Sequence, residues 1–180
     1  EAEIVRLRGE GRRVIGTEIK GEMRYRGVRI HGRADRIDRL PDGKLAVVDY
    51  KTGQPPSRRM VEDGFALQLG LIAMIAEAGG FDGVAGRAEA FEYWSLAKQR
   101  GGDGFGYVEE PILEGPKKSG IPRADFLPET ERYLNDAISR WILGSEPFTA
   151  RLNPDIGGYN DYDHVMRLDE WLPSLGEGGR

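Results

Sequence analysis

The segment from residue 32 to residue 53 constrains the fold of this 180-residue chain most strongly. An alternating polar and apolar stretch containing Asp35 leads to the turn residues Pro41-Asp42-Gly43. The apolar run Leu45-Ala46-Val47-Val48 follows and ends in Asp49-Tyr50-Lys51. This pattern predicts two antiparallel strands joined by a tight turn. The pairing brings the carboxylate of Asp35 beside that of Asp49 at a sheet edge.

The two-residue period of a strand decides which side chains share a face. It places Asp49 and Lys51 on one face and Tyr50 on the other. Upstream, alternate residues make a polar face that ends at Asp35, and the alternation breaks just after this residue. The break predicts a bulge or the end of the strand there. The other members of this polar face are Arg29, His31 and Arg33.

Two carboxylates and a lysine at one place predict a site for a divalent metal and a phosphate. Mg²⁺ prefers oxygen ligands and is often held by one or two protein carboxylates, with water and substrate phosphate completing the shell. Asp35 and Asp49 supply that minimum, and the Lys51 ammonium would neutralise charge on a phosphate. The alternative is that Asp49 and Lys51 form an ordinary surface ion pair.

The motifs also carry a family resemblance. Gly32-Arg33-Ala34-Asp35-Arg36-Ile37-Asp38, followed by Val47-Val48-Asp49-Tyr50-Lys51-Thr52-Gly53, resembles the PD-(D/E)xK nuclease superfamily, specifically its RecB-like branch. Within that branch the chain is similar to the C-terminal nuclease domain of the AddB subunit of bacterial AddAB helicase-nucleases. That likeness includes Gln68-Leu69-Gly70-Leu71 and the segment from Tyr162 to Trp171. The resemblance implies an α/β restriction-endonuclease-like core, with a central mixed sheet flanked by helices.

The resemblance implies roles for five residues. Asp35 and Asp49 would bind Mg²⁺ or Mn²⁺, and the Tyr50 carbonyl would complete the metal shell. Lys51 would serve catalysis. Gln68, on the helix after the second strand, would orient the lysine or the substrate.

The chain departs from the family pattern at two places. Members of the RecB-like branch often carry a tyrosine four residues after the helix glutamine, where this chain has Ile72. The histidine or glutamate of the family's preceding helix is not identified, and neither His31 nor His164 can be assigned to it. Glu18 is a candidate further acidic ligand, with a solvated strand carboxylate as the alternative.

The implied function is metal-dependent cleavage of an unwound DNA strand in double-strand break repair. The implied partners are an AddA-like helicase-nuclease subunit and the rest of the chain's own parent protein, in the cytoplasm. One alternative is a nuclease-like scaffold that binds DNA or a partner without cutting. Another is a nuclease of a different PD-(D/E)xK branch that acts alone on duplex DNA.

Composition agrees with one globular domain over residues 1–180, with an extended tail over 147–180. The chain is 39% hydrophobic and 31% charged, and no apolar run approaches the ~20 residues of a membrane span. It contains no cysteine, so this sequence provides no disulfide and no four-cysteine iron-sulfur cluster. A start at glutamate suggests a piece of a longer protein.

Charge is unevenly distributed along the chain. Residues 1–40 carry 11 Arg and Lys against 7 Asp and Glu, a net of +4, whereas the whole chain has a net charge of −4. We therefore expect Arg29, His31 and Arg33 to track DNA phosphates beside the metal. The alternative is that these arginines only pair with Glu18, Glu22 and other surface acids.

The remaining elements are predicted from periodicity and turn residues. Residues 63–78 form a helix with Gln68 at the border of its core face, and residues 88–96 form a strand that pairs with the Asp49 strand. Residues 96–128 are largely loop, and residues 128–143 form an amphipathic helix. The core face of the first helix is predicted to consist of Leu67, Leu71, Met74 and Ile75.

Overall fold

The computed structural model describes residues 9, 11–98 and 105–147. The chain divides into two compact units, residues 1–145 and 146–180, and the described residues belong almost entirely to the first. The predicted tail therefore lies outside the described residues, except for its first position, residue 147.

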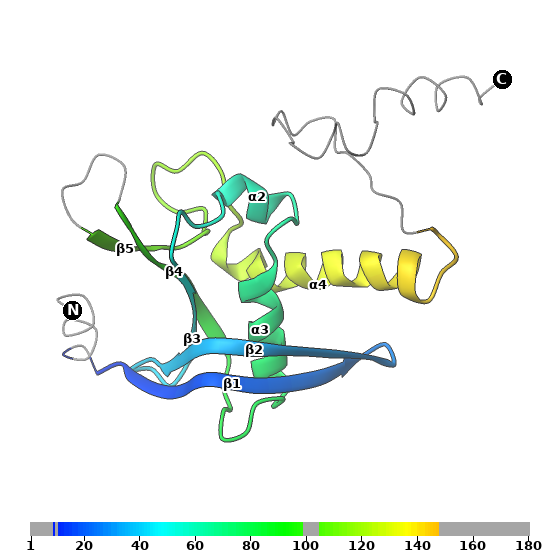
Figure 1. The fold of residues 1–180 in the computed structure, drawn as a ribbon, viewed down its shortest axis with the longest axis horizontal. Helices are drawn as coiled ribbons and strands as arrows, with labels where there is room; N and C mark the ends of the chain where they lie inside the picture. The colour runs from blue at the N-terminus through cyan, green and yellow to red at the C-terminus, as the bar shows by residue number, and fades with distance from the viewer. Residues whose placement is uncertain (1–8, 10, 99–104, 148–180) are drawn as a thin grey trace. The chain divides into compact units, whose positions relative to one another are not determined.

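The described strands form one five-stranded sheet in the order β1-β2-β3-β4-β5 (Figure 1). All neighbouring strands are antiparallel except β3 and β4, which are parallel. A parallel pair needs a long crossover connection, which here contains the helices α2 and α3. The predicted α/β class with a central mixed sheet is thus confirmed. The strands are β1 (Arg13–Tyr25), β2 (Val28–Arg39), β3 (Leu45–Lys51), β4 (Ala88–Lys98) and β5 (Phe105–Glu109).

The main helices pack in succession on the sheet. α3 (Gln68–Glu77) contacts β1 to β4 and runs across β1 and β2 in Figure 1. α4 (Phe126–Ala137) packs against α3 and continues into a π-helical turn (Ile138–Ile142). Close packing of the two helices depends on Gly70, because a Cβ there would lie 2.1 Å from Thr130 Oγ1. No helix among residues 9, 11–98 and 105–147 is long and apolar enough to cross a membrane.

Two tight turns set the register of the first three strands. Arg26 and Gly27, with φ of 50° and 83°, join β1 to β2, as the mirror-image turns of hairpins require. The predicted Pro41-Asp42-Gly43 turn joins β2 to β3. Gly43 takes φ 84° and its N–H donates to the Leu40 carbonyl at 2.9 Å. The second turn fixes which residues of β2 and β3 lie opposite each other.

The crossover departs from the predicted single helix over 63–78. A short helix α2 (Arg58–Glu62), capped by Ser57, is followed by irregular backbone and then by α3. Of the four predicted core residues only Ile75 is fully buried, together with Leu69 and Ile72. The predicted stripe was wrong because α3 is apolar nearly all round, so periodicity alone does not select its buried side.

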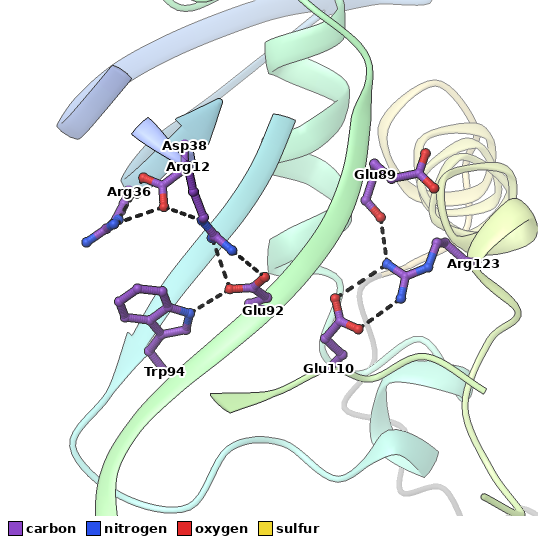
Figure 2. Close-up of polar contacts among 8 residues, drawn as sticks. All are labelled: Arg12, Arg36, Asp38, Glu89, Glu92, Trp94, Glu110 and Arg123. Atoms are coloured by element: carbon purple, nitrogen blue, oxygen red, sulfur yellow. Dashed lines mark hydrogen bonds and ion pairs between the residues drawn. The ribbon is translucent and has the colours of Figure 1, made fainter. Parts of the chain in front are cut away.

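The predicted loop over 96–128 was wrong in part. β5 adds an antiparallel edge strand to the sheet, and Arg123–Asp125 forms a 3-10 turn before α4. Arg123 ties this segment down, donating to the Glu89 carbonyl at 2.7 Å and to Glu110 at 2.9 Å (Figure 2). The predicted strand over 88–96 is confirmed as β4, and it pairs with β3 as expected.

A buried network of charges joins β2 to β4 on the sheet face opposite α3 (Figure 2). Arg12 donates to Asp38 at 2.7 Å and to both Glu92 oxygens at 2.8 and 3.0 Å. Arg36 donates to both Asp38 oxygens, and the Trp94 indole N–H donates to Glu92 at 2.7 Å. We call Arg12, Arg36, Asp38, Glu92 and Trp94 the charge network. Its bonds align β2 and β4 on either side of β3.

Candidate active site

Asp35 lies where the pairing of β2 with both neighbouring strands is interrupted. On one side, Thr17 and Ile19 pair with β2 but Glu18, which would face Asp35, has φ 52°. On the other side, pairing with β3 begins only at Arg36. β2 itself continues to Arg39, so the predicted strand end after Asp35 was wrong, and the irregularity lies in the partner strand.

The Asp35 carboxylate replaces a backbone acceptor at this interruption. Its Oδ2 accepts a hydrogen bond from the Tyr50 N–H at 3.0 Å. This bond fixes a carboxylate of β2 against the end of β3, next to Asp49. The two carboxylates are therefore neighbours, as the strand and turn pattern predicts.

Asp49 is only 4% exposed, on the sheet face that α3 covers. Burial raises the pKa of its carboxyl group; the nearby Lys51 opposes this shift and the Asp35 charge adds to it. Lys51 Nζ lies 2.7 Å from Oδ2, which makes an ion pair. This ion pair is the contact that Oδ2 makes among the described residues. A carboxylate with a single cationic partner keeps lone pairs that a metal ion can use.

Lys51 connects the end of β3 to the start of α3. Its Nζ donates to Gln68 Oε1 at 3.3 Å, and Gln68 is the first residue of α3. Its side chain is 28% exposed, so the ammonium group is open to solvent on one side. The two residues that the motifs predict to act together do lie in contact.

Tyr93 is a further polar group of this face that the motifs did not reveal. It lies opposite Asp49 in the parallel ladder of β3 and β4, and the Lys51 ammonium is 5.7 Å from its ring centroid. Its hydroxyl is buried without a hydrogen-bond partner in the part of the chain that the structure describes. Burial, with a smaller contribution from the Asp49 charge, raises its pKa.

Tyr50 points its side chain to the other face of the sheet. Its hydroxyl accepts a long hydrogen bond of 3.4 Å from Arg36, and its ring meets Trp94 edge to face at 5.9 Å. The Tyr50 N–H is committed to Asp35, and the carbonyl, the predicted metal ligand, belongs to the second-last residue of β3. The side chain of Tyr50 is thus structural.

The donor set fits a hard divalent cation. Two neighbouring carboxylates, one of them buried with Lys51 as its cationic partner, match the one or two protein carboxylates that typically hold Mg²⁺. No group of three or more His, Cys, Asp or Glu side chains with metal-binding placement occurs among the described residues. The candidate further ligand Glu18 instead pairs with Arg33 at 3.1 Å.

The predicted phosphate-contacting residues lie on the exposed side of β2. Arg29 pairs with Glu22 at 3.4 Å and Arg33 with Glu18, so the alternative pairing with surface acids is present. All four side chains are about 60% exposed, and such pairs are weak. His31 and Arg33 border two surface hollows, of about 690 and 510 Å³, and the smaller one also contains Gln68 and Tyr93.

Comparison with known proteins agrees with this arrangement. Residues 1–155 match the model of the PD-(D/E)XK nuclease superfamily. Uncharacterized proteins of Rickettsia typhi (RT0391) and Rickettsia conorii (RC0550) are 35% and 34% identical over 72 and 71 residues, which is 38% and 37% of this chain. The matched part spans only 8% of the length of each of these relatives.

A solved structure, the crystal structure of SSO0001, aligns with 81% of this chain and 57% of its own, at 19% identity and a TM-score of 0.32. The family assignment rests on the superfamily model, which spans most of the sequence. This chain belongs to the PD-(D/E)XK nuclease superfamily.

Proposed function

We propose that this domain is a Mg²⁺- or Mn²⁺-dependent deoxyribonuclease that hydrolyses phosphodiester bonds of an unwound DNA strand. The observation that carries the proposal is the buried Asp49 carboxylate, which lies beside Asp35 and forms an ion pair with Lys51 at 2.7 Å. A further cation would offset the cost of burying this carboxylate next to the Asp35 charge. Superfamily membership supports the nuclease chemistry.

Asp35, Asp49 and the Tyr50 carbonyl would hold the metal ion. When bound, such an ion lowers the pKa of a coordinated water and stabilises negative charge on a phosphodiester. The chain positions the carboxylates for this in two ways: the Tyr50 N–H orients Asp35, and burial on β3 fixes Asp49.

Lys51 is the catalytic cation in this proposal. Its contacts with Asp49 and Gln68 restrict it to the C-terminal end of β3, the central strand, while its exposed side can meet a phosphate oxygen or the attacking water. A fixed ammonium at this position stabilises the charge that develops during displacement. Gln68 positions the lysine through the bond to its Oε1.

The DNA backbone would follow the exposed side of β2. Arg29, His31 and Arg33 line one strand that leads to Asp35, at the two-residue spacing that keeps them on one face. Because their acidic partners are solvent-exposed, exchanging these ion pairs for phosphate contacts has a small energetic cost.

We further propose that the domain, residues 1–180 with a tail at 147–180, acts as an exonuclease within an AddB-like subunit in double-strand break repair. It would work in the cytoplasm beside an AddA-like helicase-nuclease subunit and the rest of its parent chain. The motif order and Gln68 support this, and the relatives that share one segment are far longer than this chain. Because it contains no cysteine, this sequence provides no thiolate ligand for an iron-sulfur cluster.

The first experiment measures Mn²⁺ binding by calorimetry and cleavage of a labelled single strand, for the wild type, Asp49→Ala and Lys51→Ala. We expect Asp49→Ala to lose both binding and cleavage. Lys51→Ala should retain Mn²⁺ binding and lose at least about 10²-fold in cleavage rate. Asp136→Ala and Lys118→Ala, on exposed positions away from the site, are the matched controls.

The outcomes separate the nuclease from its alternatives. Cleavage at the wild-type rate by both site variants would remove this site from the mechanism. A folded wild type that binds DNA, does not bind Mn²⁺ and does not cut DNA would favour a non-catalytic scaffold. Faster cutting of blunt duplexes than of single strands would favour a nuclease of another branch.

A further inference from the structure

An apolar groove of about 510 Å³ opens directly beside the proposed catalytic residues. Apolar side chains of α3 and of the segment before it form most of its lining, with Phe65, Leu67 and Leu71 among them. Phe65 is 52% exposed although it is a large aromatic residue. We call this hollow the apolar groove.

The few polar groups of the apolar groove are placed unevenly. His31 and Arg33 lie along its β2 side, and Gln68 connects it to Lys51. The Tyr93 ring also lines it, while the Tyr93 hydroxyl is closed to solvent. An apolar lining with a small number of polar groups is the usual composition of a site for a small, flat organic ligand.

We propose that the apolar groove binds an unpaired nucleobase of the strand being cut, next to the scissile phosphate. Phe65 would stack on the base. His31 and Arg33 would meet the phosphates on either side of this nucleotide. The proposal rests on the proposed nuclease function, and it names the feature of the substrate that this site recognises.

Three observations favour this occupant. The groove is continuous with the phosphate-cleaving residues through Gln68, so a nucleotide whose phosphate meets Lys51 has its base within reach. Its rim carries Arg33, whose positive charge complements a polyanion. Aromatic side chains bind single strands by stacking on bases of any sequence, and an exposed phenylalanine is suited to that contact.

The same features select against an intact duplex. A paired base is stacked between its neighbours and reaches a protein pocket only when it is flipped out, at an energetic cost. A single strand offers its bases without that cost. The apolar groove would therefore make the domain prefer single strands before the cleavage step.

The test measures binding of the 180-residue chain to fluorescent oligonucleotides in EDTA, so that it does not depend on catalysis. The probes are an eight-nucleotide thymine strand, an abasic strand of the same length and charge, and a blunt duplex. We expect the wild type to bind the thymine strand at least about 5-fold more tightly than the abasic strand, from one stacked base.

One variant and two controls decide the result. Phe65→Ala should abolish the preference for the thymine strand while leaving affinity for the abasic strand unchanged. Tyr93→Phe keeps the ring and removes only a hydroxyl that solvent does not reach, so it should retain the preference. Leu143→Ala, an equally exposed apolar residue in the turn after α4, should retain the full preference.

Other outcomes would overturn the proposal. The proposal fails if the wild type binds all three probes with equal affinity or binds none of them. It also fails if Phe65→Ala lowers the affinity for both single strands equally. Phe65-dependent self-association without DNA would mean that the groove receives a second copy of the chain. Base-dependent binding without cleavage in Mn²⁺ would contradict the nuclease function and leave the groove assignment standing.

Discussion

The two faces of the sheet treat buried charge in opposite ways. On one face, the carboxylates of the charge network accept hydrogen bonds from Arg12, Arg36 and Trp94 (Figure 2). On the other face, Asp49 and Tyr93 lie opposite each other on β3 and β4 and are similarly buried, but Asp49 has only the Lys51 ion pair and the Tyr93 hydroxyl has no hydrogen-bond partner among the described residues. Both faces have similar burial, so burial does not explain the difference.

The difference predicts which charges serve the fold and which would serve a ligand. In the charge network, burial by itself would lower the pKa of Arg12, but hydrogen bonds and charges from Glu92 and Asp38 outweigh it and raise the pKa. At Asp49, burial prevails over the attraction of Lys51 and the pKa of the carboxyl is raised. The chain therefore stabilises the ionised form on one face and penalises it on the other.

The largest effect is expected from breaking the charge network. Asp38→Asn keeps the shape of the side chain but leaves two arginines against one carboxylate in a buried site. We expect a loss of about 3–5 kcal/mol in the free energy of unfolding, measured by urea titration. Asp136→Asn, which breaks an exposed ion pair on α4, should change it by less than about 0.5 kcal/mol. Similar losses in the two variants would show that the network does not hold the strands.

The second prediction is that the same Asp-to-Asn substitution on the other face of the sheet raises the free energy of unfolding instead of lowering it. Asp49→Asn in metal-free protein should raise the free energy of unfolding at neutral pH by about 0.5–2 kcal/mol while abolishing cleavage. The folded-state pKa of Asp49 lies above its unfolded value, so its charge destabilises the fold above that folded pKa.

The pH dependence provides the control for this prediction. The destabilisation of the fold by ionised Asp49 decreases as the pH falls from the folded-state pKa towards the ordinary aspartate value. In this range the folded protein binds a proton at Asp49 more readily than the unfolded chain does. The advantage of Asp49→Asn should therefore shrink below the folded pKa, in melting curves recorded from pH 7 downwards. A variant less stable than the wild type at pH 7 would mean that the Lys51 pair outweighs burial.

The part of the site within one hairpin is predictable from sequence, because its geometry is local. The Pro41 to Gly43 turn and the strand period suffice to bring Asp35 to Asp49 and Lys51. Tyr93 is not predictable in this way, since its place opposite Asp49 depends on the parallel register of β3 and β4, which 36 residues of crossover separate. The functional roles of Asp35, Asp49, Lys51 and Gln68 stay predictions.

The features that the sequence did not predict also depend on contacts between distant parts of the chain. Arg12 shows no signal in sequence that it will reach Glu92, because the contact joins positions 80 residues apart. The buried side of α3 is decided by packing on the sheet and on Thr130, not by a polar stripe. The edge strand β5 follows a sequence segment that is rich in glycine, as loops are. Among the described strands, β5 pairs with β4.

A third prediction tests the link between the catalytic face and α3. Gln68→Ala removes the acceptor of the Lys51 ammonium and should lower kcat about 10-fold with little change in KM. The melting temperature should stay the same because Gln68 is exposed. A rise in KM with unchanged kcat would mean that Gln68 contacts the substrate and does not position the lysine.

The smallest effects are expected at the exposed arginines of β2. Arg29→Ala and Arg33→Ala remove exposed ion pairs, so each should change the free energy of unfolding by less than about 0.5 kcal/mol. If these residues contact phosphates, each substitution should lower the slope of log affinity against log salt by about one, for single strands of any sequence. Arg59→Ala, which removes a comparably exposed pair with Asp63 on α2, is the matched control and should keep the wild-type slope. Unchanged slopes in both β2 variants would mean that Glu18 and Glu22 retain the arginines when DNA is bound, and that the phosphates follow another path to Asp35.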